Sequence, residues 1–158
     1  MAEKNENIYG IKYEVDIEEL KTSTAEAGRQ IKMANAQFNE ASSSMSNWAT
    51  DVDGLNAKLT QLNTILQAEK VKLAQSKNSY NDLLDTIESN AQQIQILKDK
   101  KQNLIQQYGA ESAEVKAVSK ELAKLEREQA NNVKQADNLN ISIHNQQASV
   151  NRTQKSIN

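Results

Sequence analysis

Few residues in this 158-residue chain are of a type that carries out chemistry. There is no cysteine and His144 is the only histidine, which excludes a thiol nucleophile, a disulfide framework and a histidine metal cluster. Lone carboxylates such as Glu69 and Glu111 lack a nearby titratable partner of the kind that would split their pKa values. No glycine-rich phosphate loop is present. The sequence therefore predicts a protein that is not an enzyme and needs no cofactor or metal.

The charge balance excludes two further classes of partner. The 19 basic and 21 acidic residues give a net charge of −2, and like charges form no long run, so we expect no specific nucleic-acid binding. The apolar stretches are far shorter than the ~20 residues that span a bilayer, so we expect no membrane segment. Asn and Gln are unusually frequent, with 18 and 16 residues, and they predict a polar but weakly charged surface.

The apolar residues recur every seven positions from Ile17 to Ile157, with a partner series three residues later that starts at Leu20. Of the 41 positions in the two series, 31 are apolar, which is the a/d stripe that helices need to bury a shared seam. We therefore predict an all-α protein built as an extended heptad coiled coil of long helices. An ordinary amphipathic bundle is the alternative, but the unbroken heptad phase favours the coiled coil.

This stripe is the predicted self-association seam. Its members are Ile17, Leu20, Ile31, Phe38, Met45, Trp48, Leu55, Leu59, Leu62, Leu66, Leu73, Tyr80, Leu83, Ile87, Ile94, Leu97, Leu104, Tyr108, Val115, Val118, Leu122, Leu125, Leu139, Ile143 and Val150. Asn90 and Asn132 interrupt the stripe and are the predicted register residues, because a buried Asn is satisfied in only one alignment. Simple hydration of these layers is an equally weighted alternative.

Local signals divide the stripe into segments at 1–16, 17–48, 54–108 and 112–157, which we expect to form one elongated unit. The serines of 42–46 favour helix poorly, and Asp51 or Asp53 can cap a new helix, so we predict a hinge near 49–54. Gly109 can follow a helix C-terminus and Ser112 can cap the next helix. A turn near 109–112 would fold the last two segments into an antiparallel hairpin, and a continuous rod is the alternative.

Residues 11–16 differ from the rest of the chain. Ile11, Tyr13 and Val15 alternate with polar residues, which is the period of a half-buried strand. A single strand has no partner within this sequence, so it would fray or pair with a sheet edge on another subunit or protein.

Four segments follow one another in a recognisable order. They are Ile11-Lys12-Tyr13-Glu14-Val15, Ile31-Lys32-Met33-Ala34-Asn35-Ala36-Gln37-Phe38, Met45-Ser46-Asn47-Trp48 and Asp53-Gly54-Leu55-Asn56-Ala57-Lys58-Leu59. This succession closely resembles the N-terminal region of tail tape-measure proteins from long-tailed phages and prophages of Gram-positive bacteria. The resemblance covers most of residues 11–130, and its specific part is Phe38, Met45 to Trp48 and Asp53-Gly54-Leu55.

The resemblance implies a structural role in the virion. Proteins of this family occupy the lumen of the tail tube, several copies side by side, and their extended length sets how much tube protein polymerises around them. It further implies a homo-oligomer, a trimer by family analogy, with the tail tube protein and tail assembly chaperones as partners. The expected localisation is the host cytoplasm during assembly and then the tail tube lumen, which the protein leaves ahead of DNA during genome ejection.

The length of the sequence departs from the family. Members normally run to many hundreds of residues, so we expect a fragment, a truncated prophage copy or a complete short protein, and functions of later sections are not assigned to this chain. A helical-hairpin adaptor or scaffold module that binds a protein partner is the alternative function.

Overall fold

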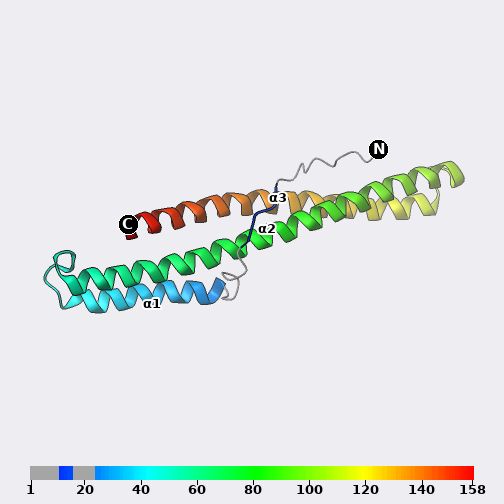
Figure 1. Ribbon diagram of the computed structural model, residues 1–158. Helices are drawn as coiled ribbons and strands as arrows, with labels where there is room; N and C mark the ends of the chain where they lie inside the picture. Colours follow the sequence, from blue (N-terminus) through cyan, green and yellow to red (C-terminus); the bar gives the residue numbers. More distant parts are fainter. Residues whose placement is uncertain (1–10, 16–23) are drawn as a thin grey trace. The chain divides into compact units, whose positions relative to one another are not determined.

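The computed structural model describes residues 11–15 and 24–158 of the chain (Figure 1). Within these ranges the chain forms three α-helices, α1 (Thr24–Ser43), α2 (Val52–Tyr108) and α3 (Ala113–Ile157), with a short 3-10 helix, η2 (Trp48–Thr50), between the first two. No strand is present in the part of the chain that is described. The prediction of an all-α protein is confirmed.

The strand-like segment predicted at 11–16 forms no strand over residues 11–15, as expected for a segment without a partner in the same sequence, and residue 16 lies outside the described ranges. A strand needs a partner edge to satisfy its backbone, and the described residues offer none. The segment is instead held by its side chains: Lys12 forms an ion pair with Asp85, and the Tyr13 ring lies 5.7 Å from the Nζ atom of Lys77.

The first helix was predicted to cover 17–48, but α1 ends at Ser43, and residues 17–23 lie outside the described part. The serine hydroxyls at the end of the helix explain the early stop. Ser43 and Ser44 donate their side-chain hydrogen bonds to the carbonyl oxygens of Glu40 and Ala41, which competes with continuation of the helical backbone. The amide side chain of Asn47 then accepts a hydrogen bond from the Ala49 N–H and begins η2.

Helix α2 begins at Val52 because Asp51 caps it. The Asp51 carboxylate accepts hydrogen bonds from the N–H groups of Asp53 and Gly54, at 2.8 and 3.3 Å. Gly54 is buried against η2, and a Cβ atom at this position would lie 2.4 Å from the carbonyl oxygen of Trp48. The tight passage from η2 into α2 therefore requires a residue without a side chain.

The connection between α2 and α3 contains only residues 109–112. Gly109 has a positive φ of 85°, which glycine adopts without steric strain, and its N–H donates to the Ile105 carbonyl at 2.9 Å. Ser112 caps α3 by accepting a hydrogen bond from the Val115 N–H at 3.3 Å. Both helix ends are therefore satisfied within this connection.

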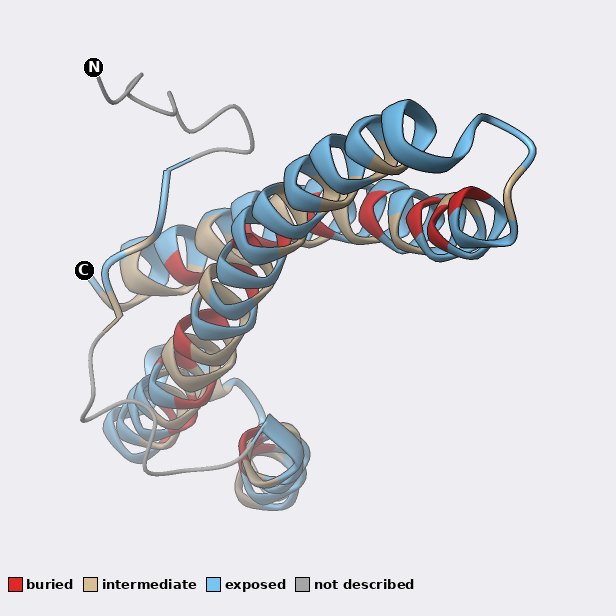
Figure 2. Ribbon diagram, turned by 90° about the vertical axis from the view of Figure 1, so that its right-hand side faces the viewer, coloured by how far each residue is buried: buried red, intermediate tan, exposed pale blue. Residues whose placement is uncertain are grey.

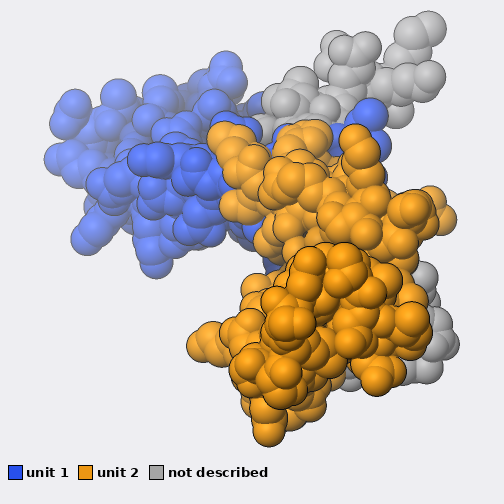
Figure 3. Space-filling model, turned by 90° about the vertical axis from the view of Figure 1, so that its left-hand side faces the viewer, with its two compact units in different colours: residues 1–12, 79–140 blue, residues 13–78, 141–158 orange. Residues whose placement is uncertain are grey.

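The chain forms two compact units (Figure 3), unit 1 with residues 1–12 and 79–140 and unit 2 with residues 13–78 and 141–158. In unit 1, the parts of α2 and α3 next to the connection lie side by side and run in opposite directions (Figure 1). In unit 2, α1 and the end of α3 both pack on the first half of α2. The buried residues lie on the faces that the helices turn toward one another (Figure 2).

Replacement of Gly54 by Ala tests the close approach of η2 to α2. The added methyl group meets the Trp48 backbone, so we expect the free energy of unfolding to fall by about 1–3 kcal/mol, as overpacking does. Gly28→Ala is the matched control, because no atom lies within 4 Å of the place that its added methyl group would take on α1, and it should stabilise the protein by up to ~1 kcal/mol. Thermal unfolding followed by circular dichroism measures both, and equal effects of the two variants would refute the contact.

Candidate functional site

The candidate site is the predicted self-association seam, which in unit 1 lies on α2 and α3. Ile87 is fully buried, and its predicted seam neighbours are buried or half-buried. The buried members are Tyr80, Ile87, Val115, Val118 and Leu122, and the half-buried members are Leu83, Ile94, Leu97, Leu104, Leu125 and Leu139. Only Tyr108, next to the connection, is exposed. The predicted seam of unit 1 is therefore covered by helices of the same chain.

In unit 2 the predicted seam is covered over part of its length. Leu66 and Leu73 of α2 and Ile143 and Val150 of α3 are buried, and Leu62 is half-buried. Leu55 and Leu59, at the start of α2, are 49% and 42% exposed.

Helix α1 and η2 contribute the remaining predicted members. Phe38 is buried, whereas Ile31, Met45 and Trp48 are half-buried. Ile17 and Leu20 lie outside the described residues.

The contact between α1 and α2 uses a second face of α2 that the apolar stripe does not include. Gly54, Gln61 and Ala68 are buried and lie seven residues apart. Gln61 donates a hydrogen bond to Asn35 of α1 at 2.8 Å and accepts one from the Lys58 ammonium at 2.6 Å. Sequence reasoning missed this face because its members are small or polar, and only their spacing of seven could have indicated it.

An aromatic cluster closes the end of this α1–α2 contact. The Phe38 and Trp48 rings pack edge to face with centroids 5.2 Å apart. The Lys58 ammonium lies 4.6 Å from the Phe38 centroid and 5.8 Å from that of Trp48, within cation–π range of both. Lys58 thereby links the end of α1, the η2 turn and α2.

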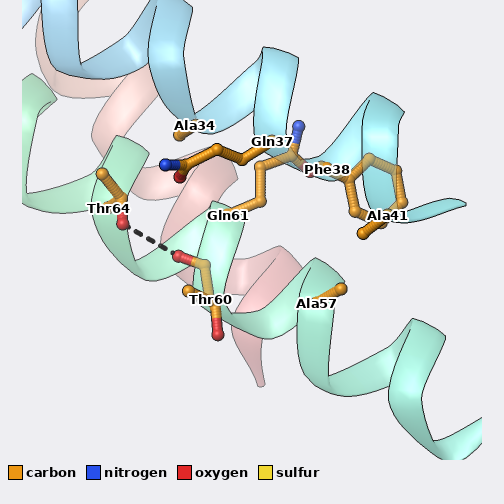
Figure 4. A pocket seen from close by; sticks show the side chains of 8 residues that line it. All are labelled: Ala34, Gln37, Phe38, Ala41, Ala57, Thr60, Gln61 and Thr64. Carbon is orange, nitrogen blue, oxygen red and sulfur yellow. Dashed lines mark hydrogen bonds between the residues drawn. The ribbon is translucent and has the colours of Figure 1, made fainter.

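Beside this cluster, α1 and α2 border a groove of about 210 Å³ (Figure 4). Its lining residues are Ala34, Gln37, Phe38, Ala41, Ala57, Thr60, Gln61 and Thr64. The alanines leave space between the helices, and the Thr64 hydroxyl is already engaged, since it donates to the Thr60 carbonyl at 3.0 Å. The lining contains no titratable side chain, so it offers no acid–base or metal chemistry.

Two polar side chains bridge the helices within the seams. In unit 1 the buried Gln129 donates to the Ile87 carbonyl at 2.8 Å. In unit 2 the Ser149 hydroxyl donates to one oxygen of Glu69 at 2.8 Å, while the other Glu69 oxygen is buried without a hydrogen-bond partner. Each of these bonds joins α3 to α2 within its own unit.

The predicted register residues Asn90 and Asn132 are both half-buried. Neither makes a side-chain hydrogen bond to another described residue. Gln129 is one of the few polar members of the first series, and a hairpin turn near 109–112 was expected to bring it near Asn90 as a shared polar layer.

Charged groups on the outer surface form local pairs. A hydrogen bond from Arg29 lowers the pKa of the Glu26 carboxyl, and the same bond raises the pKa of Arg29. The hydrogen bond to Asp85, followed by the charges of Asp85, Glu88 and Asp82, raises the pKa of the Lys12 ammonium. Among the described residues, no group of His, Asp and Glu side chains has the arrangement that could hold a metal ion.

Comparison with models of protein families, with curated proteins and with solved structures gives no match to this chain. Among the helices that the structure describes, none combines the length and the apolar character needed to cross a membrane. The function is therefore argued from the residues and their geometry.

Replacement of Ser149 by Ala tests the polar bridge in unit 2. It leaves a largely enclosed Glu69 carboxylate without its donor, so we expect a loss of about 1–3 kcal/mol in the free energy of unfolding. The double variant Glu69→Leu with Ser149→Ala removes both partners and should be more stable than Ser149→Ala alone. Ser156→Ala, on the exposed side of α3, is the control, and chemical denaturation that ranks it with Ser149→Ala would contradict the bridge.

Proposed function

We propose that this chain is a non-enzymatic structural protein of a phage tail, a tape-measure segment that helps to set tail length and occupies the lumen of the tail tube. The observation that carries the proposal is the ordered resemblance over residues 11–130, with Phe38, Met45 to Trp48 and Asp53-Gly54-Leu55 as its specific part. By the same resemblance, the tail tube protein and tail assembly chaperones are its partners, and copies of the chain lie side by side, three by family analogy.

The helical architecture supports this role through its surface and its regularity. A helix rises by a fixed amount per residue, so its length is a direct function of the number of residues, which is what a ruler requires. Exposed faces rich in Asn and Gln carry little charge, and such faces adhere weakly to the wall of a channel.

The packing of α2 on α3 refines the proposed mode of association. We propose that the α2–α3 seam is an antiparallel coiled coil within one chain, because its a and d residues are buried or half-buried there. Copies of the chain then associate through the outer faces of the helices rather than through the covered seam. The break between α1 and α2 serves as the hinge of the proposed assembly.

A helical-hairpin adaptor or scaffold module is the second candidate. The observation that favours it is the same internal coverage of the seam, since such a module needs no second copy to bury its apolar residues. This candidate differs from the first in its partner, a protein outside the phage tail.

Deletion of the gene from a phage or prophage that encodes this chain tests the tail function. We expect the chain to be detected by mass spectrometry in purified tailed particles, and the deletion to abolish tails of uniform length in electron micrographs. Expression of the chain in trans should restore them. Tails of normal length without the chain would reject the tape-measure function and leave the adaptor.

A pair of introduced cysteines joined by a thiol cross-linker tests the internal pairing, because the chain has no cysteine of its own. The Lys98 ammonium lies 3.7 Å from the Glu126 carboxylate, whereas a straight helix would separate these residues by ~42 Å. We therefore expect a short bis-maleimide to cross-link Lys98→Cys with Glu126→Cys within one monomer on a denaturing gel. Lys98→Cys with Asp137→Cys is the control, since its second cysteine lies ~16 Å farther along α3. A cross-link only between two chains would contradict the pairing.

A further inference from the structure

The exposed side of α3 in unit 1 carries a basic edge. All the Lys and Arg residues of the segment 113–140 lie on one face of the helix, at spacings of four, four, three and seven, within ~80° of its circumference. They are Lys116, Lys120, Lys124, Arg127 and Lys134, and all are exposed. The face opposite to them holds the buried Val115, Val118 and Leu122, so the basic edge points away from α2.

Most basic residues of this edge form no ion pair with another described residue. Lys116 lies 3.7 Å from Glu111, a highly exposed pair. Lys120, Lys124, Arg127 and Lys134 form no ion pair with another described residue. A shallow depression beside Lys120, Lys124 and Arg127 is also lined by Ala117 and Glu121. The edge is therefore available to a partner that carries negative charge.

The exposed side of α2 in the same unit carries an acidic edge. Asp82, Asp85 and Glu88 are exposed, and no basic residue occurs between positions 78 and 97. All three carboxylates lie close enough to the Lys12 ammonium to raise its pKa, and Asp85 forms an ion pair with it. Asp85 of this edge therefore already binds one lysine, and Asp82 and Glu88 remain available to basic groups of a partner.

The acidic residues that flank the basic edge distinguish between two kinds of negatively charged partner, a polyanion and a helix that carries carboxylates. Glu121 and Glu128 border it on one side and Glu126 on the other, and the segment 113–140 has five acidic residues against its five basic ones. A polyanion such as a nucleic acid would meet these carboxylates and be repelled, since its charges are spread widely. A short set of carboxylates on one helix, such as Asp82, Asp85 and Glu88 of the acidic edge, brings fewer negative charges near them.

We propose that copies of this chain associate side by side through a contact between the basic edge of α3 in one copy and the acidic edge of α2 in the next. The two edges lie on different helices, so the contact is heterologous, and repetition of such a contact gives a ring or an open array. The inference rests on one premise of the proposed function, namely that several copies of the chain lie side by side. The electrostatic contact makes association sensitive to salt.

Charge reversal on each edge tests the proposal with the full chain, with sedimentation velocity as the measurement and circular dichroism as the check of folding. Lys120→Glu with Lys124→Glu, and separately Asp82→Lys with Glu88→Lys, should each raise the dissociation constant of self-association by about tenfold or more. A mixture of the two variants should restore association to within about threefold of the wild type, because each then presents a complementary edge. Lys32→Glu with Lys155→Glu and Glu14→Lys with Glu40→Lys are the matched controls on other exposed positions.

Three results would overturn the contact: a wild-type chain that stays monomeric at ~1 mM in low salt, edge variants that associate like the controls, or a mixture that stays dissociated. Wild-type binding to a DNA duplex that Lys120→Glu with Lys124→Glu abolishes, without self-association, would assign the edge to a polyanion instead. Each outcome is independent of the tail-length experiment, so the contact and the tape-measure function can fail separately.

Discussion

Burial of the a and d side chains between α2 and α3 is the constraint on which the rest of the structure depends. The chain has few aromatic residues and no proline or cysteine, so the heptad stripe is its main source of apolar burial. Ile87 and Ile143, the largest fully buried side chains, lie in that stripe. Polar residues can dominate every other face because the seams alone bury enough apolar surface to hold the helices.

The all-α fold class and the caps of α2 and α3 follow local patterns in the sequence, whereas the end of α1 at Ser43 did not match the predicted helix 17–48. The seven-residue spacing indicated helices, and Asp51, Gly109 and Ser112 lie where α2 and α3 begin and end. The segment at 11–15 shows the limit of this reasoning. Its alternation is typical of a strand, but a strand requires a partner that periodicity does not supply, and charge and ring contacts hold it instead.

The tertiary contacts of the site were less predictable, because they depend on which helices meet. A stripe of a and d residues is the same whether its partner is another chain or a later segment of the same chain. The face of α2 that receives α1 was missed since Gly54 and Gln61 are not apolar. The choice among polar residues of the stripe depends on tertiary contacts for a related reason: an Asn and a Gln in the stripe look equivalent, and it is the Gln129 side chain that reaches the backbone of α2.

The four residues between α2 and α3 also bear on the order in which the molecule folds. Closing so short a loop requires little conformational entropy, and the first contacts it allows are between residues close in sequence. We expect pairing to start beside Gly109 and to spread outward by zipping, turn by turn, through unit 1. If α3 shifted by one heptad along α2, the loop between them would have to gain seven residues. The short loop therefore disfavours misaligned pairing, which could otherwise trap a repetitive sequence during folding.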